Sequence, residues 1–397
     1  MASKILHYPV DNGDHGLISV EENGYTTHLM VDCNIRDSSA GDTKAEQFDV
    51  KADLEKILKK KTVNDVADVL FTDVFALSHG DDDHLHGFKK NFYQGDPKSY
   101  KKKNKEDGEI FIDVLWFSPM VMGESTNDDE DCFNKEAKRR IKLHRDNSAD
   151  KDLAGNRIII IGNDASESLE GLDLVRYVPG DIITRFNNRN LTTFSIFIHA
   201  PYKKQLSAAE PEKNHTSIVF QARFKMKSTD TNFATLAIFG GDADHYAWAM
   251  ILEKTKKYKN DTKQQALNFD ILLAPHHCSW TFFNDTPEDD HPDPVATALE
   301  MLDYANKGAF IVASSKVITA KDQNPPSKKA KDQYVKKLAG KSGTFLNTAS
   351  EPSEKSPEPI VFEITANGPV RPPKGKISGA VTSAGGAGAL GRSIEQG

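Results

Sequence analysis

The stretch that most limits what this chain can fold into is an apolar segment that runs directly into a dense cluster of imidazoles and carboxylates. Residues 69–71 and 74–77 are apolar and rich in β-formers, and His79, Asp81, Asp83 and His84 follow within six consecutive positions. Carboxylates this close repel one another unless a cation neutralises them, and imidazole with carboxylate is a ligand set for divalent metals. The stretch predicts a metal site at the end of a buried strand, with a solvated acidic turn as the alternative.

Two later segments show the same arrangement of a strand that ends in polar groups. Residues 235–239 are strand-like and lead through two glycines to Asp242, and residues 269–274 lead to His276 and His277. Alternating strands and helices, with polar clusters where strands end, predict a layered α/β protein.

The apolar periodicity predicts individual elements along the chain. Strands are expected at residues 16–20, 27–31, 111–117, 157–162, 193–198, 218–222, 235–239, 269–274, 309–313 and 359–364. Helices are expected at residues 51–69, 134–145, 297–305 and 328–338. The lysines at 59–61 are interpreted as the solvated end of the first helix.

Composition describes an ordinary globular chain. Its 397 residues carry a net charge of −7, which argues against coating nucleic acid by charge alone. Its three cysteines, Cys33, Cys132 and Cys278, form no close pair, so neither a disulfide framework nor a cysteine zinc site is indicated. No apolar run approaches the length of a membrane span, and we expect a cytoplasmic protein.

The chain divides by composition into a large domain and a tail. Residues 1–365 are expected to form one domain, and residues 366–397 change to a Gly/Ala/Ser-rich segment that cannot bury apolar area. We expect this tail to be flexible, and it could engage a protein partner.

The first loop has the pattern His-x-Asp-x-Asp-His-x-x-Gly, which resembles the signature loop of metallo-β-lactamase-fold hydrolases. In their commonest form a second His stands where this chain has Asp81. The Asp variant, preceded by Ser78, resembles the branch related to the hydrolase domain of the ComEC/Rec2 DNA-uptake proteins. The resemblance implies an αββα sandwich and covers about residues 8–364 through five segments in the expected order.

The resemblance also implies the members of the metal site. Besides the four residues of the first loop, Asp242 has the placement of the bridging aspartate. One residue of the His276–His277 pair is expected to bind the second metal, with His277 slightly favoured. The third ligand of the first metal is expected to be His215, with His199 as the alternative.

Several positions depart from the family's pattern or give it only weak support. Cys278 replaces the glycine that follows the His pair, and Asn324 stands before Pro325 where a His is common. The family opens with a Gly-Asp turn and a strand that ends in Asp, which corresponds to Asp14 and Asp32. Turn chemistry is the favoured interpretation of both aspartates.

The implied activity is hydrolysis assisted by two divalent ions, zinc or manganese, which would turn water into a hydroxide nucleophile near neutral pH. Asp83 is expected to carry the proton of that water as well as to bind metal, and Asp83 and His277 are the expected catalytic residues. The leading substrate is a phosphodiester, DNA or RNA, and a bacterial defence effector is one setting. The basic segment 98–105 is either a polyanion contact or a solubility loop. The alternatives are a small-molecule ester, lactone or cyclic-nucleotide hydrolase, and a partner-binding module with a degenerate site.

Overall fold

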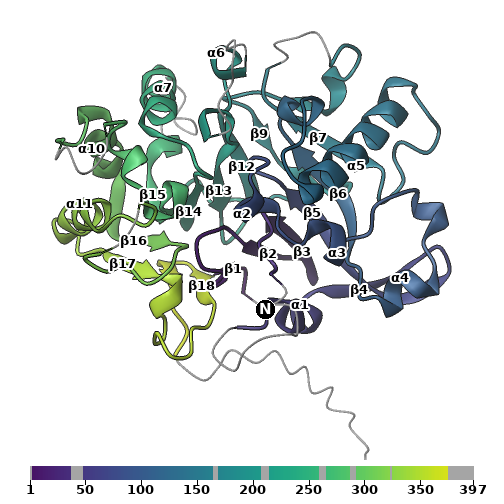
Figure 1. Cartoon of the computed structure of the whole chain (residues 1–397), viewed down its shortest axis with the longest axis horizontal. Coiled ribbons are helices and arrows are strands. Elements are labelled where there is room, and N and C mark those ends of the chain that lie inside the picture. The colour runs from purple at the N-terminus through teal and green to yellow at the C-terminus, as the bar shows by residue number, and fades with distance from the viewer. Residues whose placement is uncertain are drawn as a thin grey trace, which may run out of the picture.

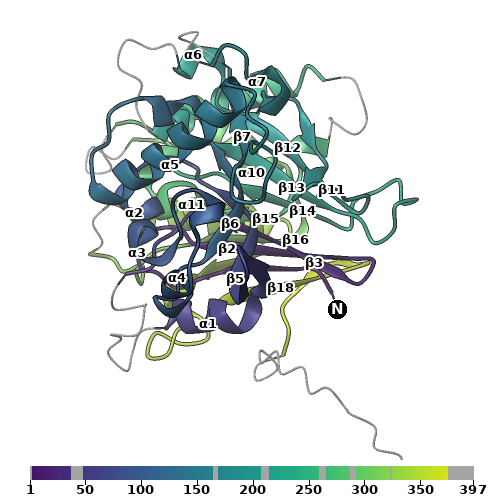
Figure 2. The same cartoon turned by 90° about the vertical axis from the view of Figure 1, so that its right-hand side faces the viewer.

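The computed structural model describes residues 2–36, 48–163, 169–206, 214–258, 265–286, 292–321 and 324–373. Within them the chain is a mixed α/β protein in which two large sheets are flanked by helices (Figures 1 and 2). The α/β class expected from the sequence is therefore confirmed.

The first sheet is built mainly from the N-terminal half of the chain. Its strand order is β19-β18-β1-β2-β3-β5-β6-β7-β8, with β4 paired to β5. The pairs from β3 through β8 are parallel, whereas β1, β2, β18 and β19 pair antiparallel with their neighbours. The strands are β1 Lys4–His7, β2 Gly16–Glu22, β3 Tyr25–Val31, β4 Lys59–Val63, β5 Val66–Ala76, β6 Phe111–Phe117, β7 Arg157–Ile161, β8 Arg176–Tyr177, β18 Ile360–Thr365 and β19 Gly368–Val370.

The second sheet comes from the C-terminal half and has the order β17-β16-β15-β14-β13-β12-β9. Its strands are β9 Ile182–Ile183, β12 Phe194–Ala200, β13 Val219–Phe224, β14 Thr235–Phe239, β15 Phe269–Leu273, β16 Ala305–Ala313 and β17 Thr344–Asn347. A separate hairpin pairs β10 (Arg185–Phe186) with β11 (Arg189–Asn190).

Three apolar clusters define the layers. The largest contains residues of both sheets, such as Trp116 of β6 and Phe239 of β14, so the sheets pack face to face. A second cluster joins the outer face of the first sheet to α1, α3 and α5, and a third joins the outer face of the second sheet to α7, α10 and α11. The helices are α1 Val50–Ile57, α2 Asp82–Leu85, α3 Phe88–Asn91, α4 Lys102–Glu106, α5 Asp128–Arg145, α6 Lys203–Leu206, α7 His245–Thr255, α9 Pro275–Cys278, α10 Ala296–Asp303 and α11 Lys328–Ala339.

The helix predicted at residues 51–69 is wrong in its second half. The helix ends at Ile57, and the lysines at 59–61 lie on β4 instead of on a helix end. A hairpin competes successfully because Asn64 and Asp65 both take positive φ angles, 43° and 63°, which a tight β-turn of this hand requires. The Lys61 ammonium then lies 3.7 Å from the centre of the Phe71 ring.

Two boundaries also differ from expectation. Helix α5 begins at Asp128, because the Asn127 side chain caps its first turn by accepting from the Glu130 N–H. At the other end, β19 pairs with β18 beyond residue 365, so the first sheet extends past the expected domain boundary. Residues 374–397 of the expected tail lie outside the described residues. No helix in the described part of the chain is long and apolar enough to cross a membrane.

Candidate metal centre

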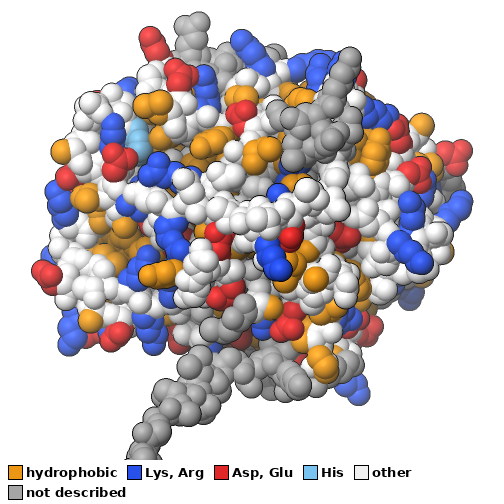
Figure 3. All heavy atoms as spheres, turned by 180° about the vertical axis from the view of Figure 1, so that it is seen from behind, with side chains coloured by type: hydrophobic (Ala, Val, Ile, Leu, Met, Phe, Trp, Pro, Cys, Tyr) orange, Lys and Arg blue, Asp and Glu red, His pale blue; other side chains and the backbone are white. Residues whose placement is uncertain are grey.

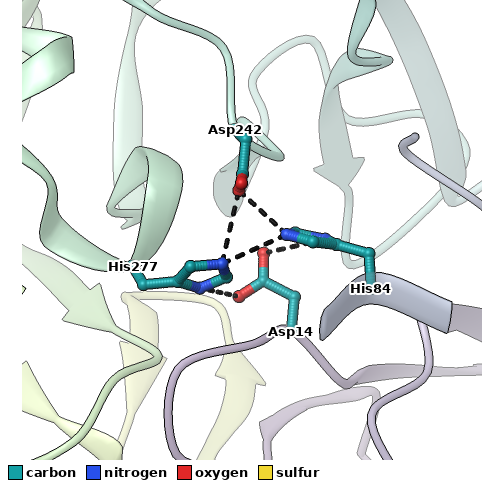
Figure 4. A group of neighbouring side chains, drawn as sticks. All are labelled: Asp14, His84, Asp242 and His277. Atoms are coloured by element: carbon teal, nitrogen blue, oxygen red, sulfur yellow. Dashed lines mark hydrogen bonds and ion pairs between the residues drawn. The ribbon is translucent and has the colours of Figure 1, made fainter. Parts of the chain in front are cut away.

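Four buried side chains meet between the two sheets: Asp14, His84, Asp242 and His277 (Figure 4). They come from the β1–β2 loop, from α2, and from the segments that follow β14 and β15. One ligand atom of each lies within 4.8 Å of the others. We call this set the Asp14 group, and it could bind a metal ion.

A second set, the His79 group, adjoins the first and shares one member with it. It consists of His79, Asp81 and Asp242. The His79 Nε2 atom lies 3.4 Å from Asp81 Oδ2, and the Asp81 side chain is 37 % exposed. The His79 group therefore has one member, Asp81, that solvent reaches.

The two oxygens of Asp242 face different groups. Its Oδ1 lies 2.9 Å from His84 Nε2 and 3.6 Å from His277 Nε2. Its Oδ2 lies 3.5 Å from His79 Nε2 and 3.7 Å from His276 Nε2. One carboxylate thus stands between two sets of imidazoles, which is the geometry in which a carboxylate can touch two cations at once.

His84 is held in position by Asp32, which ends β3. Asp32 Oδ2 lies 2.9 Å from His84 Nδ1 and accepts from the Ser78 hydroxyl at 2.7 Å. Its Oδ1 accepts from the Ser78 backbone N–H at 2.6 Å. Because Nδ1 is engaged by a buried carboxylate, Nε2 is turned toward Asp242, as in the carboxylate–histidine pairs that orient metal ligands.

His277 is fixed by an unusual backbone and by the N-terminal loop. His276, His277 and Cys278 have φ angles of 49°, 53° and 68°, a run of left-handed residues that carries a conformational cost for side chains of this kind. The Gly13 N–H lies 3.2 Å from His277 Nδ1, and the Ser314 carbonyl oxygen lies 3.1 Å from the same atom. The ring therefore presents Nε2 to the centre.

Asp83 lies beside His277 on the accessible side of the Asp14 group. Its Oδ2 is 3.1 Å from His277 Nε2, and the Asp83 side chain is 35 % exposed. The Asp242 side chain, by contrast, is 3 % exposed. Asp83 is thus the carboxylate next to the Asp14 group that an incoming molecule can reach.

The charges of the centre are strongly coupled. Burial alone would lower the pKa of His277, but the Asp242 charge and the contacts with Asp14 and Asp83 raise it to about 10. Burial acts in the same sense on His84, and the charges of Asp242 and Asp32 raise its pKa well above the usual value. The pKa of Asp242 lies well below its usual value because the neighbouring imidazoles outweigh burial.

The donor atoms fit a divalent cation. His79 Nε2 and Asp242 Oδ1 are buried, and neither has a hydrogen-bond partner of good geometry among the described residues. Burying such atoms without a partner is costly, and two imidazole nitrogens, His84 Nε2 and His277 Nε2, approach to 3.2 Å. Cations bound in the two groups would satisfy these atoms.

Most of the expected ligands are brought together here. His79, Asp81, Asp83, His84, Asp242 and His277 all lie in or beside the two groups. His276 lies at the rim, on the same side as His79, with Nδ1 3.0 Å from the Thr281 hydroxyl.

The expected third ligand is not brought into either group. His215 Nε2 lies 2.5 Å from Asp244 Oδ2, at the start of α7. His199 is buried elsewhere, with Nε2 2.9 Å from the Ala266 carbonyl oxygen, and burial lowers its pKa to about 3. His276, in contrast, lies close to the Asp242 oxygen that faces His79, where the third ligand of the first metal was expected.

Sequence reasoning passed over two acidic residues of the centre. Asp14 belongs to the Asp14 group, and Asp32 holds His84. The sequence does show that Asp14 precedes a strand and that Asp32 follows one, but turn chemistry also explained both positions.

Comparisons with protein-family models and with curated proteins gave no match.

Proposed function

We propose that this protein is a metal-dependent hydrolase of the metallo-β-lactamase-like αββα type, related to the ComEC-like branch, that cleaves phosphodiesters. The observation that carries the proposal is Asp242, whose two oxygens face two separate sets of histidines. The packing of two sheets between outer helices supports the fold assignment.

The two groups would hold two divalent ions, zinc or manganese. Asp14, His84, His277 and Asp242 would hold one, and His79, Asp81 and Asp242 the other, with His276 close by. Bound ions would supply an activated water and would stabilise the charge that develops on the phosphate oxygens.

The protein's own residues have separable tasks in this scheme. Asp32 and the Gly13 loop fix the rings of His84 and His277, so that the ligand atoms need no reorganisation. Asp83, which is reachable from solvent, would accept a proton and pass it to water.

The nature of the phosphodiester is a second question. The lysines of segment 98–105 were one reason to expect a nucleic acid, yet Lys98, Lys102 and Lys103 pair with nearby carboxylates. Trp280 and Phe283 are buried in the core and cannot stack on bases. DNA or RNA remains the first candidate substrate, because of the resemblance of the metal-binding loop. The paired lysines and the buried aromatic side chains favour a small phosphodiester as the second candidate.

The proposal is tested by metal analysis and by cleavage assays. We expect about two metal ions per chain in protein purified without chelator. We also expect hydrolysis of single-stranded DNA or of bis-p-nitrophenyl phosphate when zinc or manganese is added. Asp83→Ala should reduce cleavage by about a thousandfold or more. Asp82→Ala, which changes a neighbouring aspartate that is 65 % exposed, should leave it within about twofold. Absence of bound metal, or full activity in Asp83→Ala, would overturn the proposal.

A further inference from the structure

A recess lies apart from the metal centre, beside the end of α5. Its volume is about 490 Å³, within the range of sites that enclose small organic ligands. Its walls are the turn after α5, the start of β7, the 3-10 turn Asp173–Val175 and the β10–β11 hairpin. Figure 2 shows β11 on the side of the molecule opposite α2, which carries Asp83 and His84. The recess is therefore remote from the Asp14 group.

The floor of the recess is apolar and part of it is uncovered. Ile158 and Ile159 of β7 line it, together with Leu172 and Val175. Leu174 stands at its edge and is 97 % exposed. A fully exposed leucine beside an apolar floor is a surface that a bound molecule would cover.

The rim of the recess carries the cations Lys151 and Arg185, whose hydrogen-bond partners are neutral, together with the carboxylate of Asp152. Lys151 donates to the Asn147 side-chain oxygen, and Arg185 donates to Asn188 Oδ1 at 3.1 Å. Both partners are neutral amides, and no ion pair is recorded for either cation among the described residues. Elsewhere on the surface, lysines such as Lys102 and Lys135 pair with acids one helical turn away.

The β10–β11 hairpin, which carries Arg185, is anchored to the rest of the structure. Asn187 and Asn188 both have positive φ angles, 49° and 57°, which suit the tight turn that joins β10 to β11. Asn187 is anchored by Arg157 and by the buried Asp73 carboxylate. Arg185 is therefore fixed at the mouth of the recess instead of on a free loop.

From this combination we infer that the recess is a second ligand site, and that it binds a nucleoside phosphate. The apolar floor would hold the base, and Lys151 and Arg185 would hold the phosphate oxygens through charge-assisted hydrogen bonds. A fatty acid fits less well, because many of the side chains that line the recess are polar or charged. Figure 3 shows the face toward which β11 projects, where Lys and Arg side chains lie among hydrophobic side chains.

The test uses the full chain with chelator present, so that the metal centre takes no part and the result is independent of the proposed activity. Leu174→Trp places an exposed indole at the edge of the recess, whereas Trp116, Trp248 and Trp280 are buried. We expect AMP or ATP to change the fluorescence of this indole and to bind with a Kd below about 1 mM. Inorganic phosphate and decanoate are the comparison probes.

A second set of variants locates the bound nucleotide. In the Leu174→Trp background, Lys151→Ala with Arg185→Ala should weaken nucleotide binding by about tenfold or more. Lys102→Ala with Lys135→Ala removes the same charge elsewhere and should change binding less than about twofold. The inference is overturned if no nucleotide binds, if the rim variants bind as tightly as the control, or if decanoate binds and nucleotides do not.

Discussion

At the residue scale, the candidate metal centre depends on Asp32, a carboxylate that belongs to neither of the two ligand groups. Asp32 is buried and accepts hydrogen bonds from the Ser78 backbone and hydroxyl while it contacts His84 Nδ1. An amide at this position has only one acceptor oxygen, and its N–H₂ group would face donors.

Asp32→Asn is therefore expected to weaken metal binding by about ten- to a hundredfold, because the His84 ring loses the partner that fixes its orientation. Competition with a chromophoric chelator measures the affinity, and circular dichroism checks the fold. Asp128→Asn, on an exposed ion pair with Lys89, is the matched control. Unchanged affinity in a folded Asp32→Asn protein would show that Asp32 does not orient His84.

The same residues show what the sequence could predict about the site. His79, Asp81, Asp83 and His84 stand close together in the chain, so their pattern is visible without a structure. Asp14 and Asp32 join them only because β1, β2 and β3 pair side by side. For His215 the sequence left more than one role open, because a histidine before a strand does not reveal its partner, and in the structure it contacts Asp244.

At the element scale, the turn after β14 is a close junction between the sheets. Gly241 has a φ of +49°, and a Cβ placed there would lie 3.0 Å from Ser78 Cβ and 3.2 Å from Ser217 Cβ. Its carbonyl oxygen also accepts from the His276 N–H at 3.1 Å. Three of the ligand-bearing segments, those of His79, Asp242 and His277, are in contact at this one glycine.

Gly241→Ala should lower the free energy of unfolding by about 2–4 kcal/mol, since a strained φ and overpacking act together. Gly24→Ala is the control, because Gly24 has a φ of +76° but open space around it, and it should cost only about 1 kcal/mol. Urea unfolding measures both. Equal losses in the two variants would mean that the junction is not closely packed.

The elements themselves were largely predictable where apolar runs are long. Strands such as β6 and β14 are buried along their whole length, and all their residues except Asp113 and Thr235 are apolar. The segment after Ile57 was predicted to continue the helix, whereas its lysines lie on the strand β4. Helical periodicity and strand alternation are hard to separate in a short charged run. The pairing of β19 depends on a neighbour, β18, and leaves little trace in three residues.

At the scale of the whole molecule, the metal centre joins the two halves of the chain. His79 and His84 follow a strand of the first sheet, and Asp242 and His277 follow strands of the second. Without metal, the attraction between these imidazoles and carboxylates still helps to hold the two halves together. The pKa values of these groups fix the direction in which that stabilisation changes with pH.

The pKa of His277 is about 10 in the folded protein and near 6.5 when unfolded. Its contribution to stability is therefore complete below about pH 6.5 and is lost as the pH rises toward 10. The lowered pKa of Asp242 adds stability that is present above its unfolded value and is lost in acid. Metal binding needs unprotonated imidazoles and strengthens over the interval in which His277 loses its proton.

We therefore expect the melting temperature of chelator-treated protein to fall by at least about 4 °C between pH 6.5 and 9, while the stabilisation gained on adding zinc grows. Scanning calorimetry at several pH values measures both trends. His277→Gln should flatten the fall in the chelated protein. A melting temperature that rises with pH after chelation would contradict the assigned direction of the His277 shift.

The loop that carries Asp14 is closed by residues far along the chain. The Ser314 hydroxyl donates to the Gly13 carbonyl oxygen across 301 residues, and the Asn12 side chain donates to the Pro325 carbonyl oxygen. A ribosome adding about 5–20 residues per second needs about 15–60 s to make that distance. For most of that time a nascent chain has His79 and His84 but neither His277 nor the loop closure that seats it. The centre can therefore assemble only late in translation, and an unfinished chain lacks the complete set of candidate metal ligands.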